Sequence, residues 1–328
     1  MKKILITGAG GYVGAKLVPA LLDKNYSVTA LDLFIYGKEV LDEHKNLKVV
    51  VGDIRNTNIL KEVIPSHDAV IHLACISNDP SFELNPQLGQ SINLDAFEPM
   101  VQISKKEKIK RFIYASSSSV YGLKSEKNVT EDVSLEPLTD YSKFKVECEK
   151  ILKPFNSEDF TTVTIRPATV CGYSRRQRLD VVVNILTNLA FNKREISIFG
   201  GKQLRPNIHI DDMVRSYILM LEAKKDDISG EVYNVGYDNL SIENIATKVK
   251  NIIGEDVKLK TTPTDDNRSY HISSNKIQKE LDFSPKFGVE DAIKDLKLAF
   301  EKKLLPNSLS DDVYFNIKRM EKIKLKWL

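Results

Sequence analysis

A serine run and a tyrosine–lysine pair carry the side chains best suited to acid–base chemistry. Four serines stand at 116–119, and Tyr141 and Lys145 lie four residues apart within a stretch of helical periodicity, 140–152. Four residues is about one helical turn, so the two side chains share a face, although such pairs also arise by chance on surface helices. A tyrosine with its ordinary pKa of about 10 is a poor base, but a neighbouring ammonium lowers that pKa. Tyr141 could then deprotonate a substrate hydroxyl while Ser117 hydrogen-bonds the same oxygen.

The opening of the chain predicts a dinucleotide-binding unit, which could hold a cofactor for this chemistry. It reads as strand, tight turn, helix and strand, with Gly8, Gly11 and Gly14 in the turn. The first glycine allows a sharp turn, the second leaves room for a diphosphate, and the third lets helix and strand approach. Free N–H groups at the start of the helix would bind the phosphates. The spacing is typical of a dinucleotide site, although other glycine-rich turns look similar.

Acidic residues at the ends of the next two strands could bind the ribose and the adenine of a dinucleotide. Asp32 ends the second strand, where a carboxylate can accept both ribose hydroxyls of NAD and repel a 2′-phosphate. Asp53 could bind the adenine amino group with Ile54 packed on the ring, or it could cap the helix that begins near Thr57. We therefore expect NAD as the cofactor, ready to accept hydride from the carbon whose hydroxyl Tyr141 deprotonates.

The other candidates lie at the carboxyl ends of expected strands, where open α/β sheets bind ligands. Ser77 and Asn78 follow the strand over 69–74, where a substrate role and a plain polar loop are both open. Asn93 interrupts an expected long helix over 88–106 and is either a satisfied core amide or a support for the backbone of the site. The residues expected to contact the cofactor are Gly8, Gly11, Tyr12, Val13, Gly14, Asp32, Asp53, Ile54, Leu73, Ala74, Asn93, Tyr141 and Lys145.

Composition excludes several other functions. The chain has 328 residues, 42% of them hydrophobic, and a net charge of +3, which gives no argument for nucleic-acid binding. The three cysteines form no CxxC motif, which favours a reduced, cytoplasmic setting, and the five histidines show no metal-ligand spacing. No apolar run approaches the roughly 18 residues of a membrane span, and the opening residues resemble a strand rather than a signal peptide. We therefore expect no metal, nucleic-acid or membrane partner.

The order of the elements predicts an α/β fold. Six strands alternate with helices over 1–167, which favours a doubly wound parallel sheet, of the Rossmann type, as the NAD-binding domain. Residues 168–328 read as a smaller, mostly helical substrate lobe, with segments around 205–236 returning to the first domain. The tail, 311–328, predicts an amphipathic helix that packs on the body or on a partner, with membrane contact as the less favoured alternative.

The chain resembles the extended short-chain dehydrogenases/reductases, in particular the NAD-dependent nucleotide-sugar epimerase/dehydratase family. The resemblance covers nearly the whole chain and implies bound NAD, a nucleoside-diphosphate sugar, and Ser117, Tyr141 and Lys145 as catalytic residues, with Lys145 also holding the nicotinamide ribose. It rests on TGAGGYVG (7–14), Asp32, GDI (52–54), HLAC (72–75), Asn93, SSSSVYG (116–122), YSKFK (141–145), RPATVCG (166–172), LRPNIHIDD (204–212), YNVG (233–236) and DNRSY (266–270).

The resemblance also implies substrate contacts. Arg205 and Arg268 match arginines that bind the diphosphate of the sugar nucleotide, for which the planar guanidinium is suited, with surface ion pairing as the alternative. Arg178 stands in a basic run, 174–180, with Arg175 and Arg176, and these three arginines could reach substrate phosphate or be solvated. His209 and Asp211 look structural. The residues expected to contact substrate are Ser77, Asn78, Ser118, Thr169, Arg178, Arg205 and Arg268.

Four positions depart from the better-known members of the family. In its 4,6-dehydratases an Asp and a Glu follow the catalytic hydroxyl as acid and base, whereas here these positions are Ser118 and Ser119, which disfavours dehydration. Thr169 stands where many 4-epimerases have Asn, and Cys171 where Tyr is usual, which weakens an assignment as UDP-galactose 4-epimerase. The basic run resembles a branch that acts on less common nucleotide sugars, including GDP-heptoses.

Three hypotheses follow. The first is an epimerase that oxidises carbon 4 with tightly held NAD and returns the hydride to the other face. The second is a nucleotide-sugar 4-dehydrogenase or 4-ketoreductase with net redox, GDP-heptose being one candidate substrate. The third is a non-catalytic dinucleotide-binding scaffold, since fold does not fix function. The family resemblance also implies a homodimer formed through helices near 88–106 and 141–153.

Overall fold

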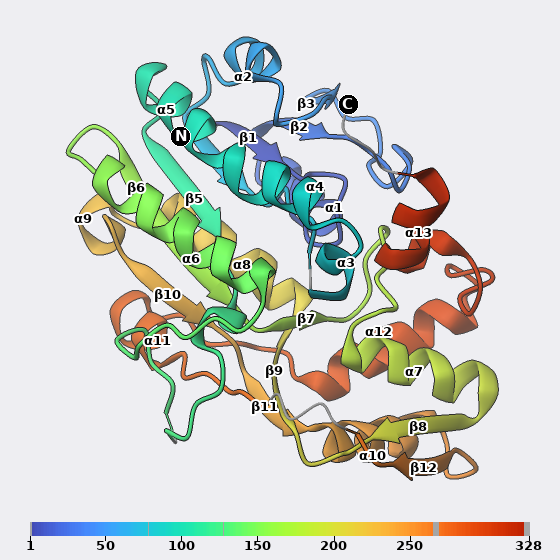
Figure 1. The fold of residues 1–328 in the computed structure, drawn as a ribbon. Coiled ribbons are helices and arrows are strands. Elements are labelled where there is room, and N and C mark those ends of the chain that lie inside the picture. The colour runs from blue at the N-terminus through green and yellow to red at the C-terminus, as the bar shows by residue number, and fades with distance from the viewer. Residues whose placement is uncertain (1, 78, 127, 265–268, 325–328) are drawn as a thin grey trace.

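The computed structural model describes residues 2–77, 79–126, 128–264 and 269–324. Its largest element is a parallel sheet of seven strands in the order β10-β6-β5-β4-β1-β2-β3 (Figure 1). The strands are β1 (Lys3–Thr7), β2 (Ser27–Asp32), β3 (Leu47–Val51), β4 (Ala69–His72), β5 (Arg111–Ala115), β6 (Thr161–Pro167) and β10 (Val232–Val235). The predicted doubly wound sheet is confirmed, and its seventh strand comes from late in the chain.

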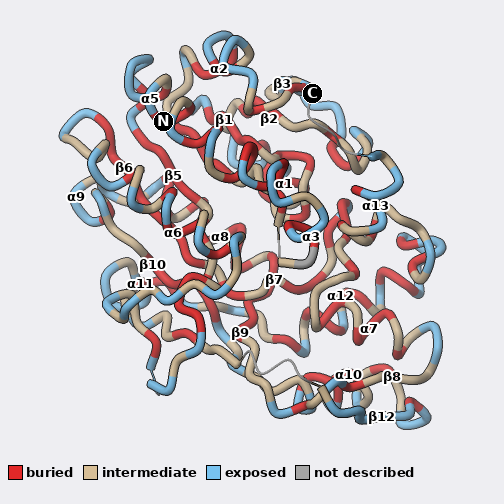
Figure 2. The backbone as a smooth tube through the Cα atoms, viewed as in Figure 1, coloured by how far each residue is buried: buried red, intermediate tan, exposed pale blue. Residues whose placement is uncertain are grey.

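Helices cover both faces of this sheet, as its apolar strands require. In β1 the side chains alternate between two cores, with Ile4 and Ile6 in one and Leu5 in the other. The first core is completed by α1 (Gly14–Asp23) and α8 (Ile210–Glu222). The second is completed mainly by α2 (Thr57–Val63), α5 (Phe97–Lys106) and α6 (Asp140–Leu152). Figure 2 shows the central strands as mostly buried, between helices with exposed outer faces.

The C-terminal lobe is mainly helical and has its own core. Helices α7 (Val182–Lys193), α10 (Ile242–Ile253) and α12 (Val289–Glu301) pack together there, in the lower part of the molecule in Figure 1. Two small sheets were largely missed by the sequence patterns, which predicted only a strand over 196–199. These sheets are β11-β9-β7, from Asp238–Ser241, Leu204–His209 and Thr169–Cys171, and β12-β8, from Lys258–Thr262 and Glu195–Phe199.

Short helices complete the described chain. They are α3 (Asp79–Glu83), α4 (Pro86–Gln90), α9 (Lys225–Ile228), α11 (Asn275–Leu281) and α13 (Asn316–Ile323). The expected tail helix over 311–328 is therefore shorter than predicted and follows a 3₁₀ turn at Asp312–Tyr314, while residues 325–328 lie outside the described residues. Across the described ranges no helix is both long and apolar enough to cross a membrane.

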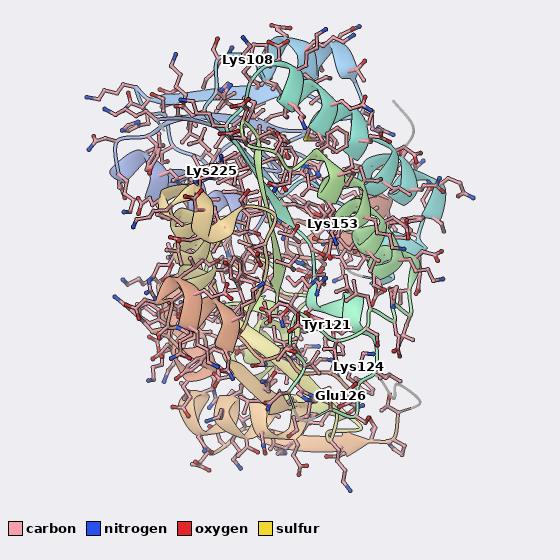
Figure 3. The ribbon with its side chains drawn as sticks, turned by 90° about the vertical axis from the view of Figure 1, so that its left-hand side faces the viewer. Lys108, Tyr121, Lys124, Glu126, Lys153 and Lys225 are labelled. Atoms are coloured by element: carbon pink, nitrogen blue, oxygen red, sulfur yellow. The ribbon has the colours of Figure 1, made fainter. Side chains whose placement is uncertain are left out.

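The two lobes meet at the carboxyl end of the sheet. Tyr121, labelled in Figure 3, lies at this junction just after β5 and is buried. Its hydroxyl donates to Asn234 Oδ1 at 2.7 Å, in the late strand β10. The late strand β10 is thus bonded, within the sheet domain, to the segment that follows β5.

Candidate active site

The glycine turn after β1 leaves space that only glycine allows. Gly8 has a φ of +75°, and a Cβ there would lie 2.5 Å from the backbone nitrogen of Ala74. A Cβ at Gly14 would lie 2.4 Å from the carbonyl oxygen of Ala9. Beside this turn lies a cavity of about 490 Å³, whose lining includes Gly8, Gly11, Tyr12, Val13 and Gly14. The turn therefore offers bare backbone and a helix start to a ligand, which fits the diphosphate of a dinucleotide.

Asp32 lies at the end of β2 in the lining of the same cavity. Its Oδ2 accepts a hydrogen bond from Gly10 N at 2.9 Å, and its Oδ1 accepts one from Phe34 N at 2.7 Å. Burial raises the pKa of Asp32, while these two backbone hydrogen bonds and the charge of Arg176 oppose that rise. The carboxylate is thus held in one orientation beside the glycine turn, where it fits a ribose diol.

Asp53 and Ile54 line the cavity after β3, but the carboxylate is already engaged. Its Oδ1 accepts from Arg55 N at 2.8 Å, and its Oδ2 accepts from Arg55 Nη2. The alternative that Asp53 caps α2 is wrong, because Asn56 is the cap and accepts from the N–H groups of Asn58 and Ile59. Arg55 therefore fixes the carboxylate at the cavity edge.

Ser117, Tyr141 and Lys145 line the cavity together. Lys145 Nζ donates to the carbonyl oxygen of Ala115 at 2.7 Å and lies 5.8 Å from the centre of the Tyr141 ring. Ser117 Oγ lies 2.8 Å from Ser119 Oγ and accepts from the backbone N–H of Ser119 at 3.1 Å. The end of β5 and the first turns of α6 thus bring the three predicted side chains to one place.

The environment of Tyr141 differs from the expected one. Burial raises its pKa well above the ordinary value, and the neighbouring Cys75 and Asp79 raise it further. The hydrogen bond with Ser117 and the charge of Arg178 act in the opposite direction. A lowered pKa is expected from Lys145 together with the positive nicotinamide ring of bound NAD. In the chain by itself, desolvation of the phenolate outweighs the favourable groups around it.

A buried network behind the serines was missed by the sequence patterns. Ser116 Oγ donates to Glu149 Oε1 at 2.5 Å, and Arg166 Nη2 donates to Glu149 Oε2 at 2.6 Å. Arg166 Nη1 also donates to the hydroxyl of Tyr121 at 2.8 Å. Glu149 stands eight positions after Tyr141, which is about two helical turns and the same face of α6. This spacing was a signal that could have identified Glu149.

Asn93 acts on the site through the backbone. Its Oδ1 accepts from Ile76 N at 2.8 Å and its Nδ2 donates to Ile76 O at 2.9 Å, which fixes the loop after β4. This loop contributes Leu73, Ala74 and Ser77 to the cavity lining, whereas Asn93 is outside that lining. The expected helix over 88–106, with Asn93 as its polar interruption, consists of α4 and α5 joined by a π-helical turn, Ser91–Asp95, in which Asn93 is buried.

The substrate candidates fall into three groups. Ser77, Ser118, Thr169 and Arg178 line the cavity, whereas Asn78 and Arg268 lie outside the described residues. Arg205 is not among the described lining residues. Its guanidinium lies 5.1 Å from the centre of the ring of Tyr270, which does line the cavity. Arg205 also donates from Nη1 to the carbonyl oxygen of Leu204 at 2.9 Å.

Arg178 lines the cavity near Tyr141, and its charge acts on that phenol. Its Nε donates to Asp180 Oδ1 at 2.9 Å and its Nη1 donates to Ser77 Oγ at 3.3 Å. Its Nη2 is buried and has no hydrogen-bond partner among the described residues. Arg178 lines the cavity and one of its nitrogens is left without a partner in the described part of the chain, which suits an anionic or hydroxyl group of a ligand.

A second polar cluster lies away from the cavity. His209, at the start of α8, accepts from Asp211 N at Nδ1, and Lys16 Nζ pairs with Asp211 Oδ1 at 2.8 Å. Asp295 Oδ2 lies 3.4 Å from His209 Nε2. Because Lys16 belongs to α1, the cluster ties α8 to the sheet domain, and the sequence had indicated a structural role for His209 and Asp211.

Comparison with known proteins identifies the family. Residues 4–236 match the model of the NAD dependent epimerase/dehydratase family. The Bacillus subtilis protein "Uncharacterized UDP-glucose epimerase YtcB" is 31% identical over 78% of this chain and 84% of its own, and a dTDP-glucose 4,6-dehydratase of Streptomyces niveus is 25% identical over 89% and 90%. A UDP-glucuronic acid 4-epimerase from Bacillus cereus, solved with UDP-glucuronic acid and NAD, is 28% identical with a TM-score of 0.83, covering 92% of this chain and 99% of its own.

These matches agree with the cavity chemistry on both cofactor and reaction class. The relatives include 4-epimerases and 4,6-dehydratases of nucleotide sugars, and solved neighbours contain NAD. The chain belongs to the NAD-dependent epimerase/dehydratase family and is an NAD-dependent enzyme of nucleotide-sugar chemistry.

Proposed function

We propose that this enzyme is a nucleotide-sugar 4-epimerase that acts through transient oxidation at carbon 4. The observation that carries the proposal is the shared cavity of Ser117, Tyr141 and Lys145 with the glycine turn and Asp32. The positions that hold acid and base in dehydratases are serines, Ser118 and Ser119, in this chain. Neutral hydroxyls do not move protons on and off carbon and a leaving hydroxyl, so elimination of water lacks its catalysts here.

The roles of the three residues follow from their positions. Tyr141 removes the proton of the carbon-4 hydroxyl, and Ser117 donates a hydrogen bond to the oxygen as it becomes a carbonyl. NAD, when bound, supplies the acceptor for the hydride of carbon 4 and its source for return to the opposite face. Lys145, fixed by Ala115 O, stabilises the phenolate of Tyr141 by its charge. On re-reduction the phenol of Tyr141 returns its proton to the same oxygen.

We assign the cofactor and substrate residues as the sequence predicted, with residues 1–167 as the main NAD-binding domain and 168–328 as the main substrate lobe. Leu73, Ala74 and Asn93 shape the cofactor side, Asn93 through Ile76. Arg178 and Ser77, joined at 3.3 Å, serve the substrate, a nucleoside-diphosphate sugar. The three free cysteines support a cytoplasmic setting.

We also propose a homodimer built on α5 and α6, which lie side by side on the outer face of the sheet (Figure 1). Light scattering after gel filtration tests this. A mass of about two chains supports it, and reversal of charge at Lys143 and Glu147 on the exposed face of α6 should then give monomers. A single-chain mass at micromolar concentration contradicts it.

A panel of UDP-, GDP- and dTDP-sugars tests the reaction itself. Each is incubated with purified enzyme without added cofactor, the products are identified by NMR, and NADH is followed by its absorbance. The proposal expects a mixture of carbon-4 epimers and no net NADH. Net NADH with a 4-keto sugar would instead favour the dehydrogenase, and a 4-keto-6-deoxy sugar would mean that Ser118 and Ser119 do not prevent dehydration.

A further inference from the structure

Arg176 is a buried arginine in the cavity lining without an acidic partner. It is 4% exposed, and among the described residues no carboxylate oxygen lies within 4.0 Å of its guanidinium. Its Nε has no hydrogen-bond partner in the described part of the chain. Its Nη1 reaches only the carbonyl oxygen of Gln177, at 3.5 Å. Asp180 and Asp32 act on this charge from a distance, but no carboxylate of the described residues contacts the guanidinium directly. Because a buried charge without a direct partner is unfavourable, the arrangement points to an anion that the cavity receives.

The position of Arg176 indicates which anion this is. Its guanidinium carbon lies 3.6 Å from the centre of the Tyr36 ring, in the loop after β2. Its charge acts on Asp32 and on Tyr12, one at the ribose position and one in the glycine turn. Two residues earlier, Ser174 Oγ donates to Tyr12 O at 2.9 Å, which joins this segment to the turn. The anion nearest to these groups in a dinucleotide is the diphosphate.

Asn316, the first residue of α13, holds Arg176 in place. It is 4% exposed and lines the cavity. Its Oδ1 accepts from Arg176 Nη2 and from the hydroxyl of Tyr36, the latter at 2.8 Å. Its Nδ2 donates to Ser77 Oγ at 3.0 Å, so both ends of the amide are engaged. The amide suits this position, because it can accept on one side and donate on the other.

The backbone of α13 adds a second anchor. Asn316 N donates to Asp180 Oδ2 at 2.9 Å, and the other oxygen of Asp180 accepts from Arg178. Further along the helix, Arg319 Nε donates to the carbonyl oxygen of Ile35, and Met320 lines the cavity. The tail is thus attached to the loop after β2 and to the segment that carries both arginines.

We propose that Arg176 binds the diphosphate of the bound dinucleotide together with the backbone of the glycine turn, and that Asn316 is the positioning residue that holds Arg176 there. The C-terminal tail is then part of the cofactor site, and release of NAD breaks the contact between its diphosphate and the buried guanidinium of Arg176. This inference rests on the NAD dependence of the enzyme and not on epimerisation, so it stands or falls without any sugar substrate.

The test measures binding of nucleotides to the full-length chain. Dissociation constants for NAD, ADP-ribose, adenosine and UDP are determined for the wild type and for Arg176→Met, with Arg175→Gln as the matched control. Arg175 is the exposed neighbour, paired with Asp42. We expect Arg176→Met to weaken NAD and ADP-ribose by about 10- to 100-fold, the usual range for losing a charged hydrogen bond. Adenosine, which lacks the diphosphate, and the control variant should show no change.

Asn316 is tested by a double-mutant cycle. Asn316→Ala should weaken NAD in the wild-type background and have no further effect in the Arg176→Met background, because it acts through that guanidinium. Asn316→Asp should also weaken NAD, since its carboxylate neutralises Arg176. Equal effects of Asn316→Ala in both backgrounds would mean a merely structural role and would overturn its assignment.

Other outcomes decide the source of the anion. If Arg176→Met binds NAD and ADP-ribose as tightly as the wild type, the proposal is overturned. If it loses only UDP, the guanidinium serves the nucleotide sugar and the assignment to the dinucleotide is wrong. Should Arg176→Met fail to fold, Arg176→Lys takes its place, because it keeps the charge and loses the planar guanidinium. If NAD affinity is unchanged both in Arg176→Lys and in Asn316→Asp, the proposal is equally contradicted.

Discussion

The ammonium of Lys145 lies 5.8 Å from the centre of the Tyr141 ring and is held there by a 2.7 Å hydrogen bond to the carbonyl oxygen of Ala115. The bond joins the second turn of α6 to the end of β5. It therefore keeps a positive charge beside a phenol whose pKa burial raises. Under the proposed mechanism, this charge should favour the phenolate of Tyr141 against its desolvation.

Replacement of Lys145 by Met should move the pH dependence of turnover. Because the phenolate is the active form, the rate rises with pH, and loss of the ammonium raises the pKa of Tyr141 and shifts that rise to higher pH. We expect a rate about 10- to 100-fold lower near neutrality that recovers partly in alkali. Lys61→Met, on the exposed side of α2, is the control. An unchanged profile in Lys145→Met would contradict the role.

Replacement of Ser117 and of Ser119, the serines after β5, should affect kcat to different extents. Ser117→Ala removes both the hydrogen bond that lowers the pKa of Tyr141 and the donor to the reacting oxygen, so kcat should fall about 100-fold. Ser119→Ala removes only a partner of Ser117 and should cost much less. Measured kcat values for the two variants check this order. A larger loss in Ser119→Ala would contradict the account, because it would mean that Ser119 and not Ser117 donates to the reacting oxygen.

The ion pair of Glu149 with Arg166 should dominate the stability of the site. The side chains are 9% and 6% exposed, and Glu149→Gln leaves the guanidinium buried without its counter-charge. We expect the free energy of unfolding to fall by about 3–5 kcal/mol. Glu147→Gln, which breaks an exposed pair with Lys150 on the same helix, should cost at most about 1 kcal/mol. Urea unfolding of both variants measures the difference, and equal losses would refute the buried-pair account.

Local pattern was sufficient to predict the part of the site built from one βαβ unit. Ile4 and Ile6 are buried in β1 as the apolar run indicated, and Asp32 lies at the end of β2 beside the glycine turn. These features depend on neighbours in sequence and on a strand period of two. That Tyr141 and Lys145 share one face of α6 could also be predicted, because a helix repeats every 3.6 residues.

Contacts between distant segments left no local pattern to detect. Asn316 donates to Ser77, 239 positions earlier, so the amphipathic tail could be recognised as a packing helix but not placed on the cavity. The π-helical turn at Asn93 is set by its bonds to Ile76 in another loop, which local periodicity does not record. The raised pKa of Tyr141 likewise depends on desolvation of the phenol by distant parts of the fold, whereas the sequence showed only the neighbouring lysine.

Tyr141→Phe tests the central claim most directly. The substitution removes only the phenolic oxygen, so NAD should remain bound in the purified protein at the wild-type ratio, as measured by mass spectrometry of the nucleotide released on denaturation. With a substrate from the nucleotide-sugar panel, formation of the carbon-4 epimer should fall by about 100- to 10,000-fold, the contribution of a positioned general base. Epimer formation by Tyr141→Phe at the wild-type rate would contradict the account, because the proton would then leave through another group.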